Sequence, residues 1–510
     1  MAELDNTFQR SGVPLEIGEL WQGNDFFFGS TQIPGTTRLA FNTRCTEGNC
    51  FDRRRGYVVW GGGGDAGQVY ASMVLQQGTS ADIFLRLVDG AGAGVQLQKY
   101  DAVNDEWDDI GTNIGTADDR TDFSWTYVQI AGEDRVYFTN GVSDLLYTNG
   151  TAVTTVPGVK GKFITSMGNI LLMGHMTATY TSNTFVYSSA GTHNFYLDDG
   201  IEDYLTTSQK VTVDGIITGI KSFNWMVYVF TESDGMFEVD ARSGYVNDFR
   251  QITTHGTMCP KSIAVGADSM FWADQYGVWQ LPIGGSVQKI SKSVDKIFQC
   301  VTGANFYQLT GGVNNKEQYE LHLGDLTFEG TAYKKVALVY EIEQSRFYER
   351  NIWRVDTDKV FANNIVTWAN EYGFPITFYG DRYTQTTYQT DYGYADITDE
   401  ITMTWQSKDF VLANDKQEIT LEDIYIRYEP LGADDIPITV YARMDTGAWV
   451  TVKTQDLPVS AKSHYTVRMQ APMGLTGRSV AIKIVSTSSL PLKIRNILVT
   501  HSYNSSERRL

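Results

Sequence analysis

The fold is decided by residues 217–240, whose sequence is ITGIKSFNWMVYVFTESDGMFEVD. A short apolar strand makes a polar turn into a second apolar strand rich in aromatic residues. The chain then turns again around Gly235 into a third strand. Short apolar runs separated by Asn, Asp, Ser and Gly are typical of antiparallel strands joined by tight turns. This stretch therefore predicts a sheet of short consecutive strands.

The same pattern recurs at residues 127–150 and 262–282, and its first two strands recur at residues 163–174. One four-stranded propeller blade needs about 40–50 residues, and blades bury their faces only by stacking against their neighbours. The four repeats are spaced on that scale. With weaker matches in residues 57–115 and 293–385, we predict an all-β fold built on a β-propeller of six or seven blades over residues 57–400.

Composition supports an all-β chain. Its 510 residues include 48 Gly, 29 Tyr, 25 Phe and 11 Trp, which favours short strands and tight turns. No apolar stretch reaches the ~20 residues that span a bilayer, so no membrane span is expected. The first residues lack the basic start and apolar middle of a secretory signal, which predicts synthesis in the cytoplasm.

A second module follows the predicted propeller. Six segments alternate apolar and polar residues at period two, which is typical of a β-sandwich. They are residues 421–429, 436–443, 449–452, 463–469, 479–485 and 492–500. We therefore expect a C-terminal β-sandwich over residues 401–510. Residues 1–56 carry little repeat character and are expected to form an irregular N-terminal arm.

Acidic residues are unevenly distributed. The chain has a formal net charge of −19, whereas residues 401–510 carry 13 basic and 11 acidic side chains. The excess of acid therefore lies in residues 1–400. A protein that grips DNA needs a positive surface, which this composition does not offer. An acidic surface would let DNA slide past without sticking, and simple solubility explains the charge equally well.

Two charged clusters are candidate sites. The carboxylates Asp105, Glu106, Asp108 and Asp109 crowd one turn beside Trp107. They do not have the spacing of a calcium loop or of a glycosidase acid pair, so a solvated structural turn is the simpler interpretation. The only basic triplet is Arg53, Arg54 and Arg55. It fits either docking onto an acidic neighbour or an exposed turn.

No motif in the chain predicts catalysis. The six histidines include no i, i+4 pair, and no Gly-x-Ser-x-Gly elbow or phosphate-binding loop is present. Cys45 and Cys50 could bridge a small loop or contribute to a metal site, but no second Cys/His pair completes four zinc ligands, which favours free thiols. We therefore assign no catalytic residue, cofactor or metal ligand and predict a protein that is not an enzyme.

Several aromatic residues lie inside the repeats. Tryptophans can line a groove that stacks on sugars, but within blades they more often fill the wedge between neighbouring sheets. We expect the wedge-filling role for the set Trp225, Phe230, Phe271, Trp272 and Trp279.

The order of these pieces resembles a known family. A basic, glycine-containing turn at Arg53–Gly56 precedes a propeller without enzymatic motifs, and the propeller ends near YGD at residues 379–381. The strand WQSKDF at 405–410 leads into the sandwich, which closes with RSVAIKIV at 478–485 and PLKIRNILV at 491–499. This layout is similar to that of tail hub, or nozzle, proteins of short-tailed bacteriophages and of related propeller proteins of tail tubes.

The resemblance implies a structural virion protein that is assembled in the bacterial host cytoplasm into the phage tail. It implies a homo-hexameric ring beneath the portal and adaptor, with a lumen through which DNA leaves and a fibre or needle protein that plugs the far end. The acidic turns at Asp105, Glu106, Asp108 and Asp109, and at Asp118 and Asp119, are then candidate linings of that conduit. Arg53, Arg54 and Arg55 are candidate docking residues. Because the channel of one propeller is usually too narrow for a duplex, we expect the conduit to run between subunits.

Two other classes of function stay open. A phage or cell-surface adhesin would use the propeller or sandwich to recognise a glycan or receptor, and would carry exposed aromatic side chains on one rim. A propeller glycosidase or lyase would require a pair of acids at fixed separation, which the sequence does not display.

Overall fold

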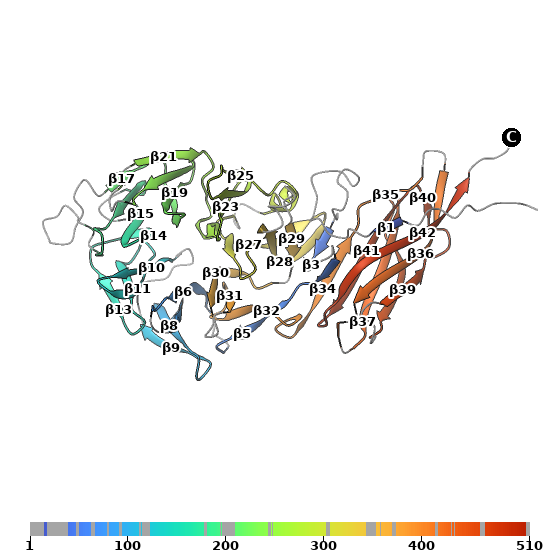
Figure 1. Cartoon of the computed structure of the whole chain (residues 1–510), viewed down its shortest axis with the longest axis horizontal. Helices are drawn as coiled ribbons and strands as arrows, with labels where there is room; N and C mark the ends of the chain where they lie inside the picture. The colour runs from blue at the N-terminus through green and yellow to red at the C-terminus, as the bar shows by residue number, and fades with distance from the viewer. Residues whose placement is uncertain are drawn as a thin grey trace, which may run out of the picture.

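The computed structural model describes residues 15–17, 39–46, 50–62, 67–78, 81–90, 94–111, 114, 123–177, 181–193, 195, 210–242, 246, 248–301, 306–342, 353–357, 359–369, 374–413, 417–429, 431–432, 434–459 and 465–505. Two β modules lie side by side, a ring of short sheets and a sandwich of longer strands (Figure 1). The predicted all-β fold is confirmed.

The ring contains seven groups of four antiparallel strands, which are numbered blades 1 to 7 along the chain. Blades 1 to 5 are separate four-stranded sheets, and blades 6 and 7 are parts of one 15-stranded sheet that continues into the second module. Blades 1 and 2 consist of β6 (Val69–Leu75), β7 (Ile83–Asp89), β8 (Val95–Asp101) and β9 (Glu106–Gly111), then β10 (Ser124–Ile130), β11 (Glu133–Thr139), β12 (Leu145–Thr148) and β13 (Val153–Val156). Blades 3 and 4 consist of β14 (Gly161–Met167), β15 (Ile170–Met176), β16 (Thr184–Tyr187) and β17 (Lys210–Thr212), then β18 (Ile217–Phe223), β19 (Met226–Thr231), β20 (Met236–Asp240) and β21 (Asp248–Thr253).

Short helical turns flank blade 5, and blades 5 to 7 complete the ring. Blades 5 and 6 consist of β22 (Ala264–Val265), β23 (Ser269–Asp274), β24 (Gly277–Pro282) and β25 (Gln288–Lys289), then β26 (Thr310–Val313), β27 (Gln318–Phe328), β28 (Thr331–Glu341) and β29 (Trp353–Asp356). Blade 7 consists of β30 (Ala362–Ala369), β31 (Pro375–Asp381), β32 (Thr387–Tyr392) and β5 (Gly56–Trp60). The helical turns are η2 (Pro260–Ser262) and α1 (Asp295–Phe298). Within the described part of the chain, no helix is long and apolar enough to cross a membrane.

The ring is closed by a strand from the beginning of the chain. β5 pairs antiparallel with β32, so that Val59 lies opposite Tyr388 at the outer edge of blade 7. Figure 1 shows this blue strand beside the orange strands that end the ring. Sheets bury their edges and faces by such pairing, so the N-terminal strand completes a blade that residues 362–392 begin.

Aromatic and aliphatic side chains fill the wedges between blades. Trp272 of blade 5 packs edge-on against Phe230 of blade 4, with ring centroids 5.5 Å apart. Phe271, also of blade 5, stacks on Tyr319 of blade 6 at 4.9 Å. All four side chains are fully buried. The expected wedge-filling role is therefore confirmed for Phe230, Phe271 and Trp272.

The second module is a sandwich of two sheets. The first sheet runs β3 (Thr43–Thr46), β4 (Cys50–Arg53), β42 (Lys493–Ser505), β36 (Gln417–Glu429) and β39 (Tyr465–Gln470), with β1 (Leu15–Ile17) paired to β42 and β40 (Thr476–Gly477) paired to β36. The second contains β2 (Leu39–Phe41), β34 (Asp399–Gln406), β41 (Ser479–Ser488), β37 (Ile436–Met444) and β38 (Val450–Leu457), with β35 (Phe410–Val411) paired to β41. Between them Phe51 stacks on Trp405 at 5.1 Å within the shared apolar core.

The N-terminal segment is not an irregular arm where it is described, and that expectation is corrected. Four strands, β1 to β4, lie within residues 1–56, and all of them pair with sandwich strands or with one another. β2 also lies between β29 of blade 6 and β34 of the sandwich, which joins the two modules in one continuous sheet. The three residues of β2 are too few to show the alternation of a strand, so β2 is recognised only by its pairing with distant strands.

Candidate functional site

The acidic turn predicted to line a conduit lies on the outer rim of the ring. Asp105 occupies the turn between β8 and β9, and β9 is the outermost strand of blade 1. The cluster Asp105, Glu106, Asp108 and Asp109 is exposed. Asp109 accepts a hydrogen bond from Gln98 at 2.8 Å. These carboxylates therefore cannot line the propeller's own channel. They face outward, where a neighbouring subunit could lie. Asp118 and Asp119 lie outside the described residues.

The basic triplet is mostly buried, and its predicted docking role is corrected for two of the three arginines. Arg53 is 0 % exposed and Arg54 is 2 % exposed. Both guanidinium groups are bound by residues of the same chain, so neither reaches a neighbouring subunit. Only Arg55 is exposed, with its guanidinium 5.0 Å from the centre of the Tyr394 ring.

Arg54 lies where the N-terminal segment, blade 6 and the exit from blade 7 meet. Its Nε donates to Asn42 Oδ1 at 2.9 Å, and its Nη1 donates to Asp396 Oδ1 at 2.7 Å. Its Nη2 donates to the Thr357 carbonyl at 3.0 Å and to the second oxygen of Asp396. Burial acts to lower the pKa of Arg54, but the Asp396 carboxylate raises it above its usual value, so the guanidinium is charged.

Arg53 binds the sandwich in a similar way. Its Nη2 donates to Ser486 Oγ at 2.6 Å, and its Nη1 donates to the Ser488 carbonyl; both acceptors lie on β41. The two neighbouring arginines thus connect different modules, one to the sandwich and one to the propeller. Because Arg53 itself belongs to β4, its bonds lie within the sandwich, and the contacts to propeller residues are made by Arg54.

Next to this junction, a second cluster of buried charged residues lies between blades 6 and 7. Glu320 of β27 accepts hydrogen bonds from the Tyr379 hydroxyl and from Asn314 Nδ2, the latter at 2.6 Å. Lys359 Nζ lies 3.5 Å from Glu320 and 3.3 Å from Asp356. The cavity beside them measures about 10 Å³, which is room for one water molecule and for no substrate. This network is therefore structural in form.

Sequence reasoning missed this buried network. Its partners come from residues far apart in the chain, and no motif brings them together. One signal was present, because the strand YELHL at 319–323 places Glu320 and His322 between apolar residues in a strand that is buried on both faces. Burial lowers the pKa of His322, which keeps its imidazole neutral beside Glu320.

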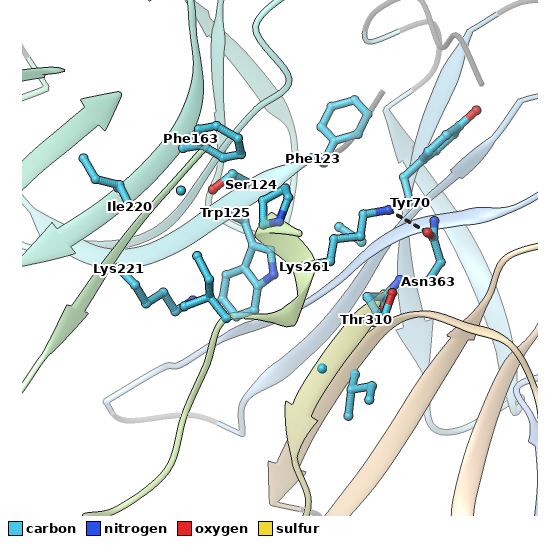
Figure 2. A pocket seen from close by; sticks show the side chains of 17 residues that line it. Tyr70, Phe123, Ser124, Trp125, Phe163, Ile220, Lys221, Lys261, Thr310 and Asn363 are labelled. Atoms are coloured by element: carbon cyan, nitrogen blue, oxygen red, sulfur yellow. Dashed lines mark hydrogen bonds between the residues drawn. The ribbon is translucent and has the colours of Figure 1, made fainter. Parts of the chain in front are cut away.

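The central channel of the propeller contains the cavity that most blades share (Figure 2). Residues from the inner strands of blades 1, 2, 3, 4, 6 and 7, together with the η2 turn that leads into blade 5, line a space of about 180 Å³. Two lysines reach it, Lys221 from β18 and Lys261 from η2, and no described lining residue is acidic. Lys261 Nζ donates to Asn363 Oδ1 at 2.6 Å, which Figure 2 draws as a dashed line.

One aromatic residue departs from the expected wedge role. Trp225 is 73 % exposed at the two-residue turn between β18 and β19. Both turn residues have positive φ, 48° at Asn224 and 60° at Trp225. Such turns favour glycine, and a bulky residue there is strained. Trp279 keeps 9 % exposure and stacks on His255 at 3.7 Å, in line with the expectation.

A groove lies beside this exposed tryptophan. It runs between blades 4 and 5, has a volume of about 560 Å³ and includes both neighbours of Trp225, Asn224 and Met226. Its polar lining includes the ion pair between Arg250 and Glu238, whose N–O distance is 2.9 Å. The groove is large enough for a small ligand.

Metal and thiol chemistry find little support in the described chain. No group of three or more His, Cys, Asp or Glu side chains there could hold a metal ion. Cys259 and Cys300 are free thiols. Cys45 and Cys50 lie on paired strands β3 and β4, but their side chains are outside the described part of the structure, so their state stays a prediction.

Comparison with known proteins identifies no family. No family model matches the chain, and no curated protein matches it. Among solved structures, an exo-β-1,3-galactanase from Phanerochaete chrysosporium, determined with galactose, is 10 % identical and has a TM-score of 0.25, covering 87 % of this chain and 100 % of its own. A computationally designed protein, Ika8, is 11 % identical with a TM-score of 0.37, covering 66 % of this chain and 99 % of its own. At these scores neither likeness carries an argument about function.

Proposed function

We propose that this chain is a structural, non-enzymatic subunit of a virion that forms a ring, the hub or nozzle, of a short-tailed phage tail. The ring conducts DNA during ejection and anchors the distal tail proteins. The observation that carries the proposal is the junction of propeller and sandwich, where β2 pairs with strands of both modules and the buried Arg54 binds residues that follow blades 6 and 7. A tail ring must withstand the passage of DNA without its subunits hinging.

We infer that the conduit runs between subunits rather than through one propeller. The small cavity at the centre of the propeller, about 180 Å³, supports this choice, since a duplex whose major groove alone is ~12 Å wide needs more room. The exposed carboxylates at residues 105–109 lie on the outer rim, where copies arranged in a ring could turn them toward a shared lumen. Like charge would hold DNA off that wall and reduce electrostatic friction.

The proposal is tested by counting copies of the chain per particle. Quantitative mass spectrometry on virions purified from a producing culture should give about six copies, the number in the hexameric ring that the family resemblance implies. Copies in the hundreds would move the chain to the capsid shell. Absence from particles would overturn the tail assignment. Cryo-electron microscopy of the same particles should then locate the ring next to the portal and adaptor.

A glycan- or receptor-binding adhesin is the second candidate, and one observation favours it. Trp225 stands exposed in a strained turn beside a groove of about 560 Å³. Exposed aromatic rings give large contact area at low entropic cost. Glycan-array binding by the full chain that Trp225→Gly abolishes would support this role. An array without binding would remove it.

A further inference from the structure

The groove between blades 4 and 5 lies where blade 5 has only a short outer strand. The outer strand of blade 4, β21, has six residues, whereas β25 of blade 5 has two. Residues 283–287, which connect β24 to β25, form the wall opposite blade 4. The space of about 560 Å³ is well above the ~150 Å³ that holds one benzene-sized molecule. It therefore has room for two six-membered rings with their substituents.

Three polar side chains of blade 4 form one row along this groove. Tyr228, Glu238 and Arg250 lie opposite one another on β19, β20 and β21, and all three line the groove. Directly opposed residues of neighbouring strands share one face of the sheet. Glu238 accepts hydrogen bonds from the Tyr228 hydroxyl at 3.2 Å and from Arg250 Nη2 at 2.9 Å. Burial and the Glu238 carboxylate raise the pKa of Tyr228, so its hydroxyl stays protonated and donates.

This row keeps unused donors and acceptors. Arg250 donates its Nε–H and one Nη2–H to Glu238, which leaves three N–H donors without a partner among the described residues. The Arg250 side chain is 70 % exposed, so a ligand can reach it. Glu238 accepts three hydrogen bonds, and a carboxylate has about four lone-pair sites. A donor and an acceptor with spare capacity thus lie side by side at the groove.

The rest of the described lining is mostly apolar. Phe223 and Leu281 line the groove and also belong to the buried apolar cluster between blades 4 and 5. Ile283 lines it from the opposite wall and is exposed. Trp225 is exposed in the two-residue turn whose other member, Asn224, lines the groove. Apolar surface beside a few placed polar groups suits a ligand with an apolar face and polar edges.

The charge of the lining selects the class of that ligand. Among the described lining residues the charged side chains are Glu238 and Arg250, which neutralise one another. A ligand carboxylate would compete with Glu238 for Arg250 and would be repelled by a chain whose net charge is −19. A ligand ammonium would be repelled by Arg250. A hydroxyl is both donor and acceptor, so it can bond to either member of the pair without breaking it.

We propose that the groove between blades 4 and 5 binds an uncharged sugar of two hexose units, whose hydroxyls bond to Glu238 and Arg250. This inference rests on the glycan-binding role given above as the second candidate function, and it names the class of glycan and the side chains that select it. The apolar faces of the sugar rings pack against the aliphatic and aromatic part of the lining.

The test uses the full chain with maltose, cellobiose and lactose, which are uncharged, and with digalacturonic acid, which is anionic. Isothermal titration at neutral pH should show saturable binding of at least one uncharged disaccharide and at least tenfold weaker binding of digalacturonic acid. Arg250→Met and Glu238→Gln should each weaken sugar binding by about tenfold or more, because each removes a charged partner of the sugar hydroxyls. Arg242→Met is the matched control, since Arg242 is also an exposed arginine paired to a carboxylate of β20 but is not among the residues that line the groove; it should bind as the wild type does.

A pair of variants on the opposite wall blocks the groove without changing the polar row. Ser286 is exposed and lines that wall. Ser286→Trp should fill part of the groove and abolish sugar binding, whereas Ser286→Ala should bind as the wild type does. Thermal unfolding midpoints equal to that of the wild type show that each variant is folded.

The outcomes separate this inference from the glycan-binding role on which it rests. Sugar binding that survives Arg250→Met, Glu238→Gln and Ser286→Trp would place the ligand elsewhere and overturn the inference, while the glycan-binding role would stand. Tighter binding of digalacturonic acid than of the uncharged disaccharides would do the same. Absence of binding to these four sugars, with binding to other glycans on the array, would also overturn the inference alone. An array without any binding would remove the role and the inference together.

Discussion

Replacement of Arg54 by methionine tests whether the junction really locks the two modules. Methionine has a similar length and no charge, so the change removes the guanidinium with little loss of volume. It leaves Asp396, which is 6 % exposed, buried without its partner. It also deprives Asn42 Oδ1 and the Thr357 carbonyl of a donor.

The expected loss in the free energy of unfolding follows from these lost contacts. Loss of one partner from a buried ion pair costs about 3–5 kcal/mol, because the remaining charge stays desolvated. Removal of both charges in the double variant Arg54→Met/Asp396→Leu should recover most of this loss, since apolar replacements of a buried pair are often neutral. Arg242→Met breaks an ion pair to Asp240 in which the arginine is 61 % exposed, and should cost less than about 1 kcal/mol.

Urea unfolding followed by tryptophan fluorescence measures the free energies of unfolding of the wild type, of these three variants and of Asp396→Leu alone. The two single changes and the double variant then form a double-mutant cycle. Limited proteolysis gives a structural readout, because a loosened junction should release the propeller and sandwich as separate fragments. The reasoning is refuted if Arg54→Met is no more costly than Arg242→Met. It is also refuted if the double variant is as unstable as the sum of its two single changes.

Three further predictions concern other parts of the molecule. Trp225→Gly should stabilise the chain by ~0.5–1 kcal/mol, since glycine adopts φ of 60° without strain; an unchanged or lower urea midpoint would contradict this. Burial acts to raise the pKa of Glu429, but Arg495 and Lys493 lower it below its usual 4.5. Ionised Glu429 therefore contributes fully to folding stability above pH 4.5, and this contribution is lost as the pH falls through the lowered pKa. In thermal melts, Glu429→Gln should make stability depend less on pH below 4.5. Reversal of the carboxylates at 105–109 to lysine should slow DNA ejection from particles in a dye-accessibility assay; unchanged ejection kinetics would remove these side chains from the conduit.

Local pattern was enough to predict most blades, because each hairpin depends on residues that are close in sequence. The stretch 217–240 forms β18, β19 and β20 as expected, and its turn at Gly235 has φ of 103°. A Cβ at Gly235 would lie 2.0 Å from the Thr253 carbonyl, which explains why the turn needs glycine. The six predicted sandwich strands were found for the same reason, since period-two alternation survives without knowledge of the partner strand.

Long-range pairing was the part that sequence could not reveal. The seventh blade has its fourth strand only because β5 pairs with β32, which lies more than 300 residues away in the sequence. Arg53 and Arg54 were interpreted as surface residues because three adjacent arginines are usually solvated, and their partners at 396 and 486–488 leave no trace nearby in the sequence. Trp225 was predicted to be buried because its sequence neighbours are apolar, but it lies in a two-residue turn that leaves its side chain exposed.

The closure of the ring by β5 also sets an order of events during synthesis. Val59 emerges from the ribosome roughly 330 residues before its partner Tyr388, a delay of about 15–65 s at usual elongation rates. Through that interval β5 is an unpaired edge strand, the kind of segment that recruits other chains. Translation that is slowed within residues 60–388 should therefore increase aggregation of nascent chains, and a supplied peptide of residues 56–60 should compete for the open edge of blade 7.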